Sequence, residues 1–410
     1  MPKQISQFKS ISTTALLGLL LIIVCSVTFA QNTSRIPTPN SSSQTNQINA
    51  TPKPPNVKAS SYILMDFHSG HVLASDNPDL QVEPASITKM MTAYVVFSEI
   101  RSGNLSLNDM ITVSEKAWRT GGSKMFIEVD KQVRVEDLIR GMIVQSGNDA
   151  CVALAEHIAG SEEVFASMMT QHAKKIGMND SNFYNATGLP AEGHLVTAND
   201  VAKLGKALIS EFPELYHFYS EKEFTFNKIK QHNRNTLLYR DPTVDGYNTR
   251  HTEAAGYCLA TSAMRNGMRL ISVIMGTESE KARADETQKL INYGFRFFET
   301  HKLYRAGEQQ VQPEIWKGEE ENISLGLADD LFITIPKGSY EQLQANVDLP
   351  NLITAPIQQG TQLGTLNIML KEKVVMQKPL VALQTAEQAG WWSRSMDGIG
   401  LWFKSFGDDD

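Results

Sequence analysis

Cysteine is scarce in this chain: its 410 residues include three, and one of them, Cys25, lies in an N-terminal segment that we expect to be removed. The other two, Cys151 and Cys258, are too few to form a disulfide framework. Neither belongs to a nucleophile motif, so we expect both to be small apolar core residues. The sequence leaves open whether they form one bridge.

Metal-binding spacings and an excess of positive charge are also missing. The sequence has no H-E-x-x-H motif and no paired-cysteine pattern. A formal net charge of -7 provides no basic surface that would attract phosphate. We therefore expect no metal, no cofactor and no nucleic-acid partner. Six histidines have no partner pattern and are expected on the surface or in loops: His68, His71, His172, His194, His217 and His232.

The N-terminal residues have the pattern of a secretory signal. Lys3 and Lys9 precede an apolar run over residues 15–24, and the small residue Ala30 follows at a suitable cleavage position. We predict a signal peptide over residues 1–30, with an uncleaved anchor helix as the alternative. Residues 31–57 are rich in Ser, Asn, Gln, Thr and Pro and poor in large apolar side chains, so we predict a disordered linker there.

Hydrophobic patterns over residues 58–303 predict an α/β fold. A hairpin is expected around His68-Ser69-Gly70, followed by a helix from Ile87 to Ile100 that lacks a polar face and is therefore buried. A helical block then precedes further strands and a closing helix, which predicts a sheet with an inserted helical subdomain. The expected helices cover residues 135–143, 149–158, 164–176, 199–209 and 281–298, and the expected strands cover 256–264 and 270–276.

Two further units are expected towards the C-terminus. Short apolar runs separated by Gly, Pro and Asp over residues 304–384 predict a small all-β domain without a catalytic cluster. Residues 385–410 carry Trp391, Trp392, Trp402 and Phe403 at helical spacing, which predicts an amphipathic helix that lies in a membrane interface. The alternative is a helix that packs its apolar stripe on the β-domain.

Ser86 and Lys89 are the first candidates for chemistry. They lie one turn apart at the start of the predicted buried helix, so the amine can approach the hydroxyl. Serine needs an adjacent base, and lysine can act as one where burial holds it partly neutral. The spacing alone is a weak signal, because Ser6 and Lys9 share it inside the predicted signal peptide.

Ser146-Gly147-Asn148 is the second candidate. The hydroxyl of Ser146 could pass a proton to a leaving amine, and the amide of Asn148 could hold a substrate carbonyl. In isolation, either side chain could instead cap the helix expected from Asp149.

In this order, the two motifs resemble the S-x-x-K and S-x-N motifs of the serine penicillin-recognising enzymes, whose third motif is K-T-G. Four passages are similar to the low-molecular-mass D-alanyl-D-alanine carboxypeptidases: PASITKMMTAYV, GMIVQSGNDACVALAEHIAG, NFYNATGLP and QHNRNTLL. The resemblance runs from about residue 60 to the C-terminus. It implies a β-lactamase/transpeptidase-like sheet with a helical subdomain over residues 58–303, a C-terminal β-domain and a terminal amphipathic helix.

The resemblance also implies a reaction and a location. Ser86 would attack the carbonyl between the terminal D-alanines of a peptidoglycan pentapeptide and form an acyl-enzyme, and β-lactams would react at the same serine. Lys89 would take the serine proton, Ser146 would relay it to the leaving D-alanine, and Asn148 would bind the peptide carbonyl. The protein would be exported and held at the periplasmic face of the bacterial inner membrane by its C-terminal helix; the oligomeric state is not indicated.

The third motif departs from the family pattern, because Asn248-Thr249-Arg250 stands where K-T-G is expected. The missing lysine would attract the substrate carboxylate and help to keep Lys89 neutral by like-charge repulsion. Residues two apart on a strand share a face, so Arg250 could carry this positive charge about 6 to 7 Å away. The expected substrate-binding residues are therefore Asn148, Asn248, Thr249, Arg250, His251 and Arg234.

Alternative functions follow from this departure. The chain is either a carboxypeptidase in which Arg250 has taken over binding of the substrate carboxylate, or an impaired enzyme that serves as a non-catalytic penicillin- or peptidoglycan-binding scaffold. A β-lactamase is disfavoured, because no E-x-x-L-N-type segment that would supply a deacylating glutamate lies between Ser146 and Asn248.

Overall fold

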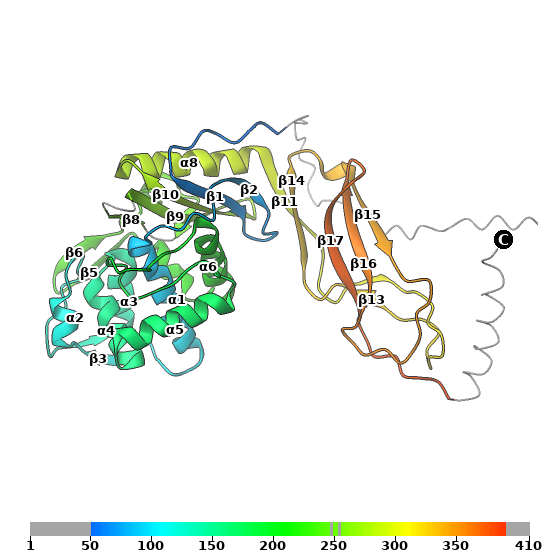
Figure 1. The fold of residues 1–410 in the computed structure, drawn as a ribbon, viewed down its shortest axis with the longest axis horizontal. Coiled ribbons are helices and arrows are strands. Elements are labelled where there is room, and N and C mark those ends of the chain that lie inside the picture. The colour runs from blue at the N-terminus through cyan, green and yellow to red at the C-terminus, as the bar shows by residue number, and fades with distance from the viewer. Residues whose placement is uncertain (1–50, 247–248, 253–255, 391–410) are drawn as a thin grey trace, which may run out of the picture.

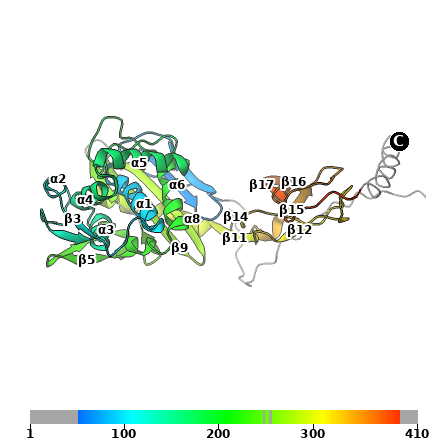
Figure 2. The ribbon, with the colours of Figure 1, turned by 90° about the horizontal axis from the view of Figure 1, so that it is seen from below.

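The structure, a computed structural model, describes residues 51–246, 249–252 and 256–390. An α/β part extends to the end of α8 (Glu280–Phe297), and an elongated β-rich part follows from β11 (Phe298–Tyr304) (Figure 1). The view from below shows the same two parts side by side (Figure 2). The predicted fold class, an α/β sheet with a helical subdomain and a C-terminal β-domain, is confirmed.

The central sheet has six strands in the order β2-β1-β10-β9-β7, with β8 also paired to β9. β1 (Ser61–Asp66) and β2 (Val72–Asp76) form the predicted hairpin, which turns through Gly70 at a φ of 72°. All the strand pairs are antiparallel. The remaining strands are β7 (Val244–Gly246), β8 (Thr249–Thr252), β9 (Gly256–Arg265) and β10 (Met268–Thr277).

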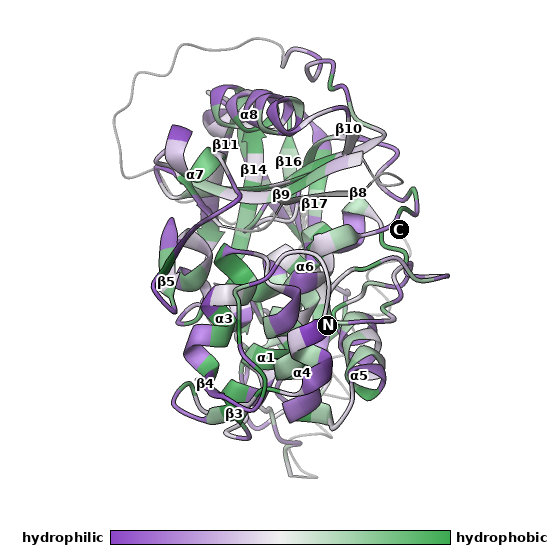
Figure 3. Ribbon diagram, turned by 90° about the vertical axis from the view of Figure 1, so that its left-hand side faces the viewer, coloured by the Kyte–Doolittle hydropathy of each residue, from purple (hydrophilic) through white to green (hydrophobic). Residues whose placement is uncertain are grey.

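Alternate residues of β1 enter two separate cores on opposite faces of the sheet. Ile63 and Met65 pack with the helical subdomain, whereas Tyr62 and Leu64 pack in the cluster that includes Leu290 of α8. Figure 1 shows α8 on one side of the sheet and the helical subdomain on the other. In Figure 3 the outward side of α8 is hydrophilic and the strands beneath it are largely hydrophobic. Because both faces are covered, the strands read as nearly continuous apolar runs.

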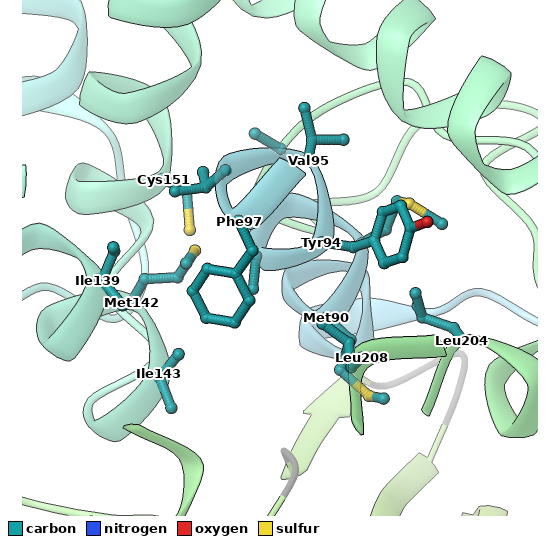
Figure 4. Packing of buried hydrophobic residues seen from close by; sticks show 14 of the residues in the cluster. Met90, Tyr94, Val95, Phe97, Ile139, Met142, Ile143, Cys151, Leu204 and Leu208 are labelled. Atoms are coloured by element: carbon teal, nitrogen blue, oxygen red, sulfur yellow. The ribbon is translucent and has the colours of Figure 1, made fainter. Parts of the chain in front are cut away.

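The helical subdomain surrounds α1 (Thr88–Arg101), as its lack of a polar face predicted. Figure 4 shows Phe97 of α1 facing Ile139 and Met142, with Leu204 and Leu208 on the opposite side of the helix. The longer helices confirm the sequence predictions, whereas the shortest elements were not predicted. The other helices are α2 (Glu115–Arg119), α3 (Val135–Val144), α4 (Asn148–Ala159), α5 (Glu162–Lys175), α6 (Ala198–Glu211) and α7 (Leu237–Arg240). The 3-10 turns are η1 (Ala85–Ile87) and η2 (Tyr216–Ser220). Two small hairpins consist of β3 (Met110–Thr112) with β4 (Gln132–Arg134) and of β5 (Glu223–Phe226) with β6 (Ile229–His232).

Several helices begin at a residue whose side chain satisfies a free backbone N–H. The hydroxyl oxygens of Ser161, Thr197 and Ser279 accept from the third residue of α5, α6 and α8, respectively. Such caps stabilise a helix by about 1 kcal/mol each. The sequence therefore determines these helix starts locally, independently of the packing.

The β-rich part contains two sheets that enclose a third core. β11 pairs with β14 (Leu331–Pro336), and five further strands follow the order β12-β13-β17-β16-β15. Leu303, Ile333, Leu366 and Leu380 are buried between them. The five strands are β12 (Gln309–Val311), β13 (Leu325–Gly326), β15 (Leu343–Asp348), β16 (Gln362–Leu370) and β17 (Lys373–Ala382), with a 3-10 turn η3 (Tyr340–Gln342) before β15.

A hydroxyl network joins the two parts of the molecule. The buried carboxylate of Asp66, at the end of β1, accepts hydrogen bonds from the Ser69 amide at 2.7 Å and from the Thr300 hydroxyl of β11 at 2.7 Å. The Thr334 hydroxyl of β14 lies 2.6 Å from that of Ser69 and 2.8 Å from that of Thr300. The hairpin turn of the first sheet is therefore bonded directly to β11 and β14 of the β-rich part.

The last described residues continue the β-rich part. Ala386 and Gln388 form isolated bridges to Ile357 and Gly318. Most of the predicted amphipathic helix, residues 391–410, lies outside the described residues, as does the predicted signal peptide. Within the described ranges, no helix has the length and apolar content needed to cross a membrane.

Candidate active site

The nucleophile candidate lies in η1, directly before α1. Ser86 is 1% exposed, and the preceding residue, Ala85, has a φ of 49° in the left-handed region. Because the chain turns sharply there and then enters α1, the side chains of Ser86 and Lys89 lie on the same side. The expected meeting of the two groups is observed: Lys89 Nζ lies 2.8 Å from Ser86 Oγ.

Three oxygen atoms surround the amine of Lys89, which is 1% exposed. Besides Ser86 Oγ, they are Asn148 Oδ1 at 2.7 Å and the backbone carbonyl oxygen of Thr187 at 2.6 Å. The three partners come from η1, the start of α4 and the loop before α6. The base candidate is therefore held from three directions by segments far apart in the sequence.

Asn148 connects the lysine to the opposite wall of the site. Its Nδ2 donates to the carbonyl oxygen of Gly121 at 2.7 Å, and its backbone N–H donates to that of Ser123 at 2.7 Å. Since a carbonyl only accepts, Nδ2 must face Gly121, and Oδ1 must therefore face Lys89. One hydrogen of the Nδ2 amide is left for a further acceptor.

Ser146 has two features that are costly in a folded protein. It is 1% exposed, and within the described ranges its hydroxyl has no hydrogen-bond partner. It also has a φ of 61°, a left-handed conformation that costs a non-glycine residue roughly 1–2 kcal/mol. A strained residue with an unpaired buried hydroxyl is typical of a functional site rather than a structural one.

The alternative role of this motif as a helix cap is wrong. The residue at the N-cap of α4 is Gly147, and no side chain bonds the first turn from that position. The neighbouring Asp149 instead accepts four backbone N–H groups with its buried carboxylate: those of Met125, Phe126, Ile127 and Ala150. Asp149, which the sequence analysis did not single out, thus ties the segment after Ser123 to the Ser146-Gly147-Asn148 motif.

The altered third motif lies at the edge of the central sheet. Thr249, Arg250 and His251 belong to β8, where Thr249 pairs with Leu259 and Arg250 with Cys258 of β9. β8 packs beside η1, which carries Ser86. Asn248 and the side chains of β8 lie outside the description. The backbone of this strand therefore borders the nucleophile, as the sequence predicted.

Arg234 lies in the exposed loop between β6 and α7. Its neighbours Asn233 and Asn235 are buried, and Asn235 Nδ2 donates to the Gly246 carbonyl at 3.4 Å and to Thr261 Oγ1 at 3.3 Å. These bonds attach the loop to β7 and β9, close in sequence to the third motif. The structure thus anchors the loop that carries this arginine near this end of the sheet.

The loop that supplies the Thr187 carbonyl was recognised only as part of a family passage. Gly188, at a φ of 81°, passes so close to η1 that a Cβ atom there would lie 1.7 Å from the Ala85 carbonyl oxygen. His194, expected on the surface or in a loop, lies in a loop and is 2% exposed. Burial lowers the pKa of His194 to about 4, and its ring is neutral near pH 7.

A groove of about 460 Å³ begins beside these groups. Its lining includes Gly121 and Thr187, whose carbonyls hold Asn148 and Lys89, and it continues past Arg119, Glu162 and Leu189. Within the described ranges, no cluster of His, Cys, Asp or Glu could hold a metal ion. A groove of suitable size for a small ligand therefore lies beside the two residues whose carbonyls hold Asn148 and Lys89.

Both described cysteines are buried free thiols in the core, as predicted. Burial raises the pKa of Cys151 to about 12 and that of Cys258 to about 11. Neither is a thiolate near neutral pH, so neither competes with Ser86 as a nucleophile.

A serine at the entry of a buried helix, with a lysine amine one turn later, defines the class of serine acyl-transfer enzymes that use lysine as the base. The family model described as D-alanyl-D-alanine carboxypeptidase matches residues 48–279, and the model of the penicillin-binding protein 5 C-terminal domain matches residues 298–388. The chain belongs to the D-alanyl-D-alanine carboxypeptidase family.

Individual relatives cover nearly the whole described chain. The D-alanyl-D-alanine carboxypeptidase DacC of Escherichia coli is 42% identical over 368 residues, which are 87% of this chain and 92% of the relative. The crystal structure of penicillin binding protein 5 from Haemophilus influenzae matches with a TM-score of 0.80 and 42% identity, covering 82% of this chain and 99% of that one. Penicillin-binding protein D2 from Listeria monocytogenes, solved in its ampicillin-bound form, matches with a TM-score of 0.54 and 30% identity, covering 59% of this chain and 100% of that one.

Proposed function

We propose that this chain is a serine-type D-Ala-D-Ala carboxypeptidase that removes the terminal D-alanine from peptidoglycan stem peptides through an acyl-enzyme. The observation that carries the proposal is the Lys89 amine, 2.8 Å from the Ser86 hydroxyl and held by the oxygens of Asn148 and Thr187. Relatives named for this activity cover most of the chain. The ampicillin-bound Listeria protein supports β-lactams as ligands of the same site.

The geometry around Lys89 explains how a lysine acts as a base. A neutral amine has two N–H groups and one lone pair. The oxygens of Asn148 and Thr187 only accept, so each takes an N–H group. In the neutral form that the proposed role requires, the lone pair can then face the Ser86 hydroxyl, which lies 2.8 Å away and is the group to be deprotonated.

The reaction follows in two stages. As Ser86 Oγ bonds to the carbonyl carbon of the penultimate D-alanine, Lys89 takes the hydroxyl proton. The proton then passes through Ser146 to the nitrogen of the terminal D-alanine, which leaves as the amide bond breaks. Water attacks the resulting ester and regenerates Ser86. The hydroxyl of Ser146, which has no hydrogen-bond partner within the described ranges, suits the relay. The second amide hydrogen of Asn148 suits the substrate carbonyl.

The substrate would bind as an extended strand beside β8. This strand lies at the sheet edge and borders η1, so its backbone groups can bind a peptide in an extended conformation next to Ser86. The terminal carboxylate needs a cation or a hydrogen-bond donor near the third motif. Arg250 and Arg234 are the candidates, because Asn248 carries no charge.

The chain lacking residues 1–30 tests this proposal with a D-Ala-D-Ala peptide and a fluorescent penicillin. We expect release of D-alanine and covalent labelling, both abolished in Ser86→Ala. A sharp loss of turnover in Arg250→Ala indicates that Arg250 binds the substrate carboxylate in place of the missing lysine of the third motif. If the parent chain is labelled without turnover, and the double variant Asn248→Lys/Arg250→Gly regains turnover, the result supports instead the penicillin-binding scaffold. Absence of labelling and of turnover from the parent chain contradicts the proposal.

We also propose that the protein is exported and attached to the periplasmic face of the inner membrane by residues 385–410. The Trp and Phe residues of this segment suit the headgroup boundary, and all of them follow the last described bridge of the β-rich part, at Gln388. Deletion of residues 387–410 should move the protein from the membrane fraction to the soluble fraction. Unchanged sedimentation with membranes would sink this proposal.

A further inference from the structure

The Thr187 carbonyl is placed by one asparagine side chain. Asn185 Oδ1 accepts hydrogen bonds from the backbone N–H of Gly188 at 2.7 Å, and from the N–H and hydroxyl of Thr187 at 3.1 and 3.0 Å. Its Nδ2 donates to the Leu189 carbonyl at 2.9 Å. Asn185 therefore bonds to Thr187, Gly188 and Leu189 of the turn. The Gly188 N–H shares a peptide plane with the Thr187 carbonyl, so its bond to Asn185 orients that carbonyl.

A buried histidine links this turn to α1. His194 Nε2 lies 3.2 Å from the hydroxyl of Thr88, the residue before Lys89, and its Nδ1 lies 3.4 Å from Asn185 Nδ2. Asn185 Nδ2 only donates, so Nδ1 of the neutral ring accepts and the Nε2–H group donates to Thr88. His194 therefore spans the gap between the turn and the helix that carries the base.

We propose that Asn185 and His194 are positioning residues for Lys89: they hold the Thr187 carbonyl against the amine, so that the lone pair of the amine faces Ser86. This proposal rests on the proposed function, in which Lys89 is the base. Without the carbonyl in place, the amine can turn and present an N–H group to Ser86 instead of its lone pair. Neither residue touches the reacting atoms.

The expected effect is on the acylation rate. Small displacements of a reacting group cost about 100-fold in rate. We therefore expect Asn185→Ala to slow the first-order acylation of the full-length chain by fluorescent penicillin roughly 10- to 100-fold, and His194→Phe to slow it several-fold. The dissociation constant of the preceding non-covalent complex should change less than about twofold in His194→Phe, because His194 does not line the groove, whereas Asn185 does.

Asn185→Asp is the rescue variant. Its carboxylate still accepts the bonds from Thr187 and Gly188, so acylation should stay within about threefold of the parent rate. Asn199→Ala and His172→Phe are matched controls at other positions: Asn199 donates to Asp79 at the surface, and His172 lies on α5 against Tyr94. Both controls should acylate at the parent rate.

The outcome is decisive whichever variants fold. Equal loss in Asn185→Ala and Asn185→Asp, or an unchanged acylation rate in both Asn185→Ala and His194→Phe, overturns the proposal. A crystal structure of each variant supplies a readout that does not need activity: the distance from Thr187 O to Lys89 Nζ, here 2.6 Å, should exceed 3.5 Å in Asn185→Ala and His194→Phe but not in Asn185→Asp. A parent chain that is never acylated refutes the proposed function, and these distances still decide the positioning role.

Discussion

At the residue scale, the catalytic side chains could be predicted from short sequence motifs, whereas the backbone groups that contribute to the site could not. Ser86, Lys89 and Asn148 were found from spacing, and the structure brings their polar atoms together. The Thr187 carbonyl has no sequence signature, because every residue carries a carbonyl. The burial of His194 was missed because it depends on segments that pack together only in the fold.

The Ser146 hydroxyl should matter for turnover and not for stability. Removing an unpaired buried hydroxyl leaves no broken bond, so Ser146→Ala should keep the free energy of unfolding within about 1 kcal/mol of the parent value. Turnover of a D-Ala-D-Ala peptide should fall by about 100-fold, the usual lower size of a proton-transfer effect.

Ser272→Ala is the control for this change. The Ser272 hydroxyl, on β10, is also buried and has no hydrogen-bond partner within the described ranges. Denaturant unfolding should give a similarly small effect for both variants, while Ser272→Ala keeps full turnover. A Ser146→Ala variant as active as Ser272→Ala would show that the relay runs elsewhere.

At the element scale, the long helices and strands of the core could be predicted because their apolar character is sustained over many residues. The helix α1 and the strands β9 and β10 are examples, each at least ten residues long and largely apolar. The five-residue α2 and the β5–β6 hairpin are too short to show a period and were missed. Their positions are set by packing against the helical subdomain instead.

The close approach of the Gly188 turn to η1 gives a prediction for these two segments. Gly188→Ala would place a Cβ atom 1.7 Å from the Ala85 carbonyl oxygen, so the turn or η1 must shift. We expect a loss of unfolding free energy larger than the roughly 1–2 kcal/mol cost of the left-handed backbone alone, and at least a tenfold loss in acylation rate.

Gly103→Ala separates the two causes. Gly103 has a similar φ of 75°, but a Cβ atom there meets no atom within 4 Å. It should lose stability through backbone strain alone and keep its acylation rate. Equal stability and equal acylation of the two variants, measured by thermal melting and penicillin labelling, would show that the contact with η1 is unimportant.

At the scale of the whole molecule, the α/β part and the β-rich part are joined by the bonds of Thr300 with Asp66 and of Ser69 with Thr334. Asp66→Ala would leave buried donors without an acceptor, at a cost of about 1–3 kcal/mol. We expect calorimetry to show earlier or separate unfolding of the two parts, with acylation by penicillin unchanged.

Asp79→Ala is the matched control, because Asp79 accepts one hydrogen bond from Asn199 at the exposed surface. It should melt like the parent. If Asp66→Ala melts in one transition at the parent temperature, the network does not couple the two parts.

The direct bonding of Ser69 to Thr334 and of Thr300 to Asp66 has a geometric consequence. A rigid β-rich part keeps the active site at a fixed distance from its far end, whereas a flexible linker would let the active site sample a range of distances. With the far end of the β-rich part at a membrane, as proposed, the enzyme would act on peptidoglycan strands at one distance from that membrane. A longer β-rich part, with the active site unchanged, would then direct the enzyme to a different layer of the peptidoglycan wall.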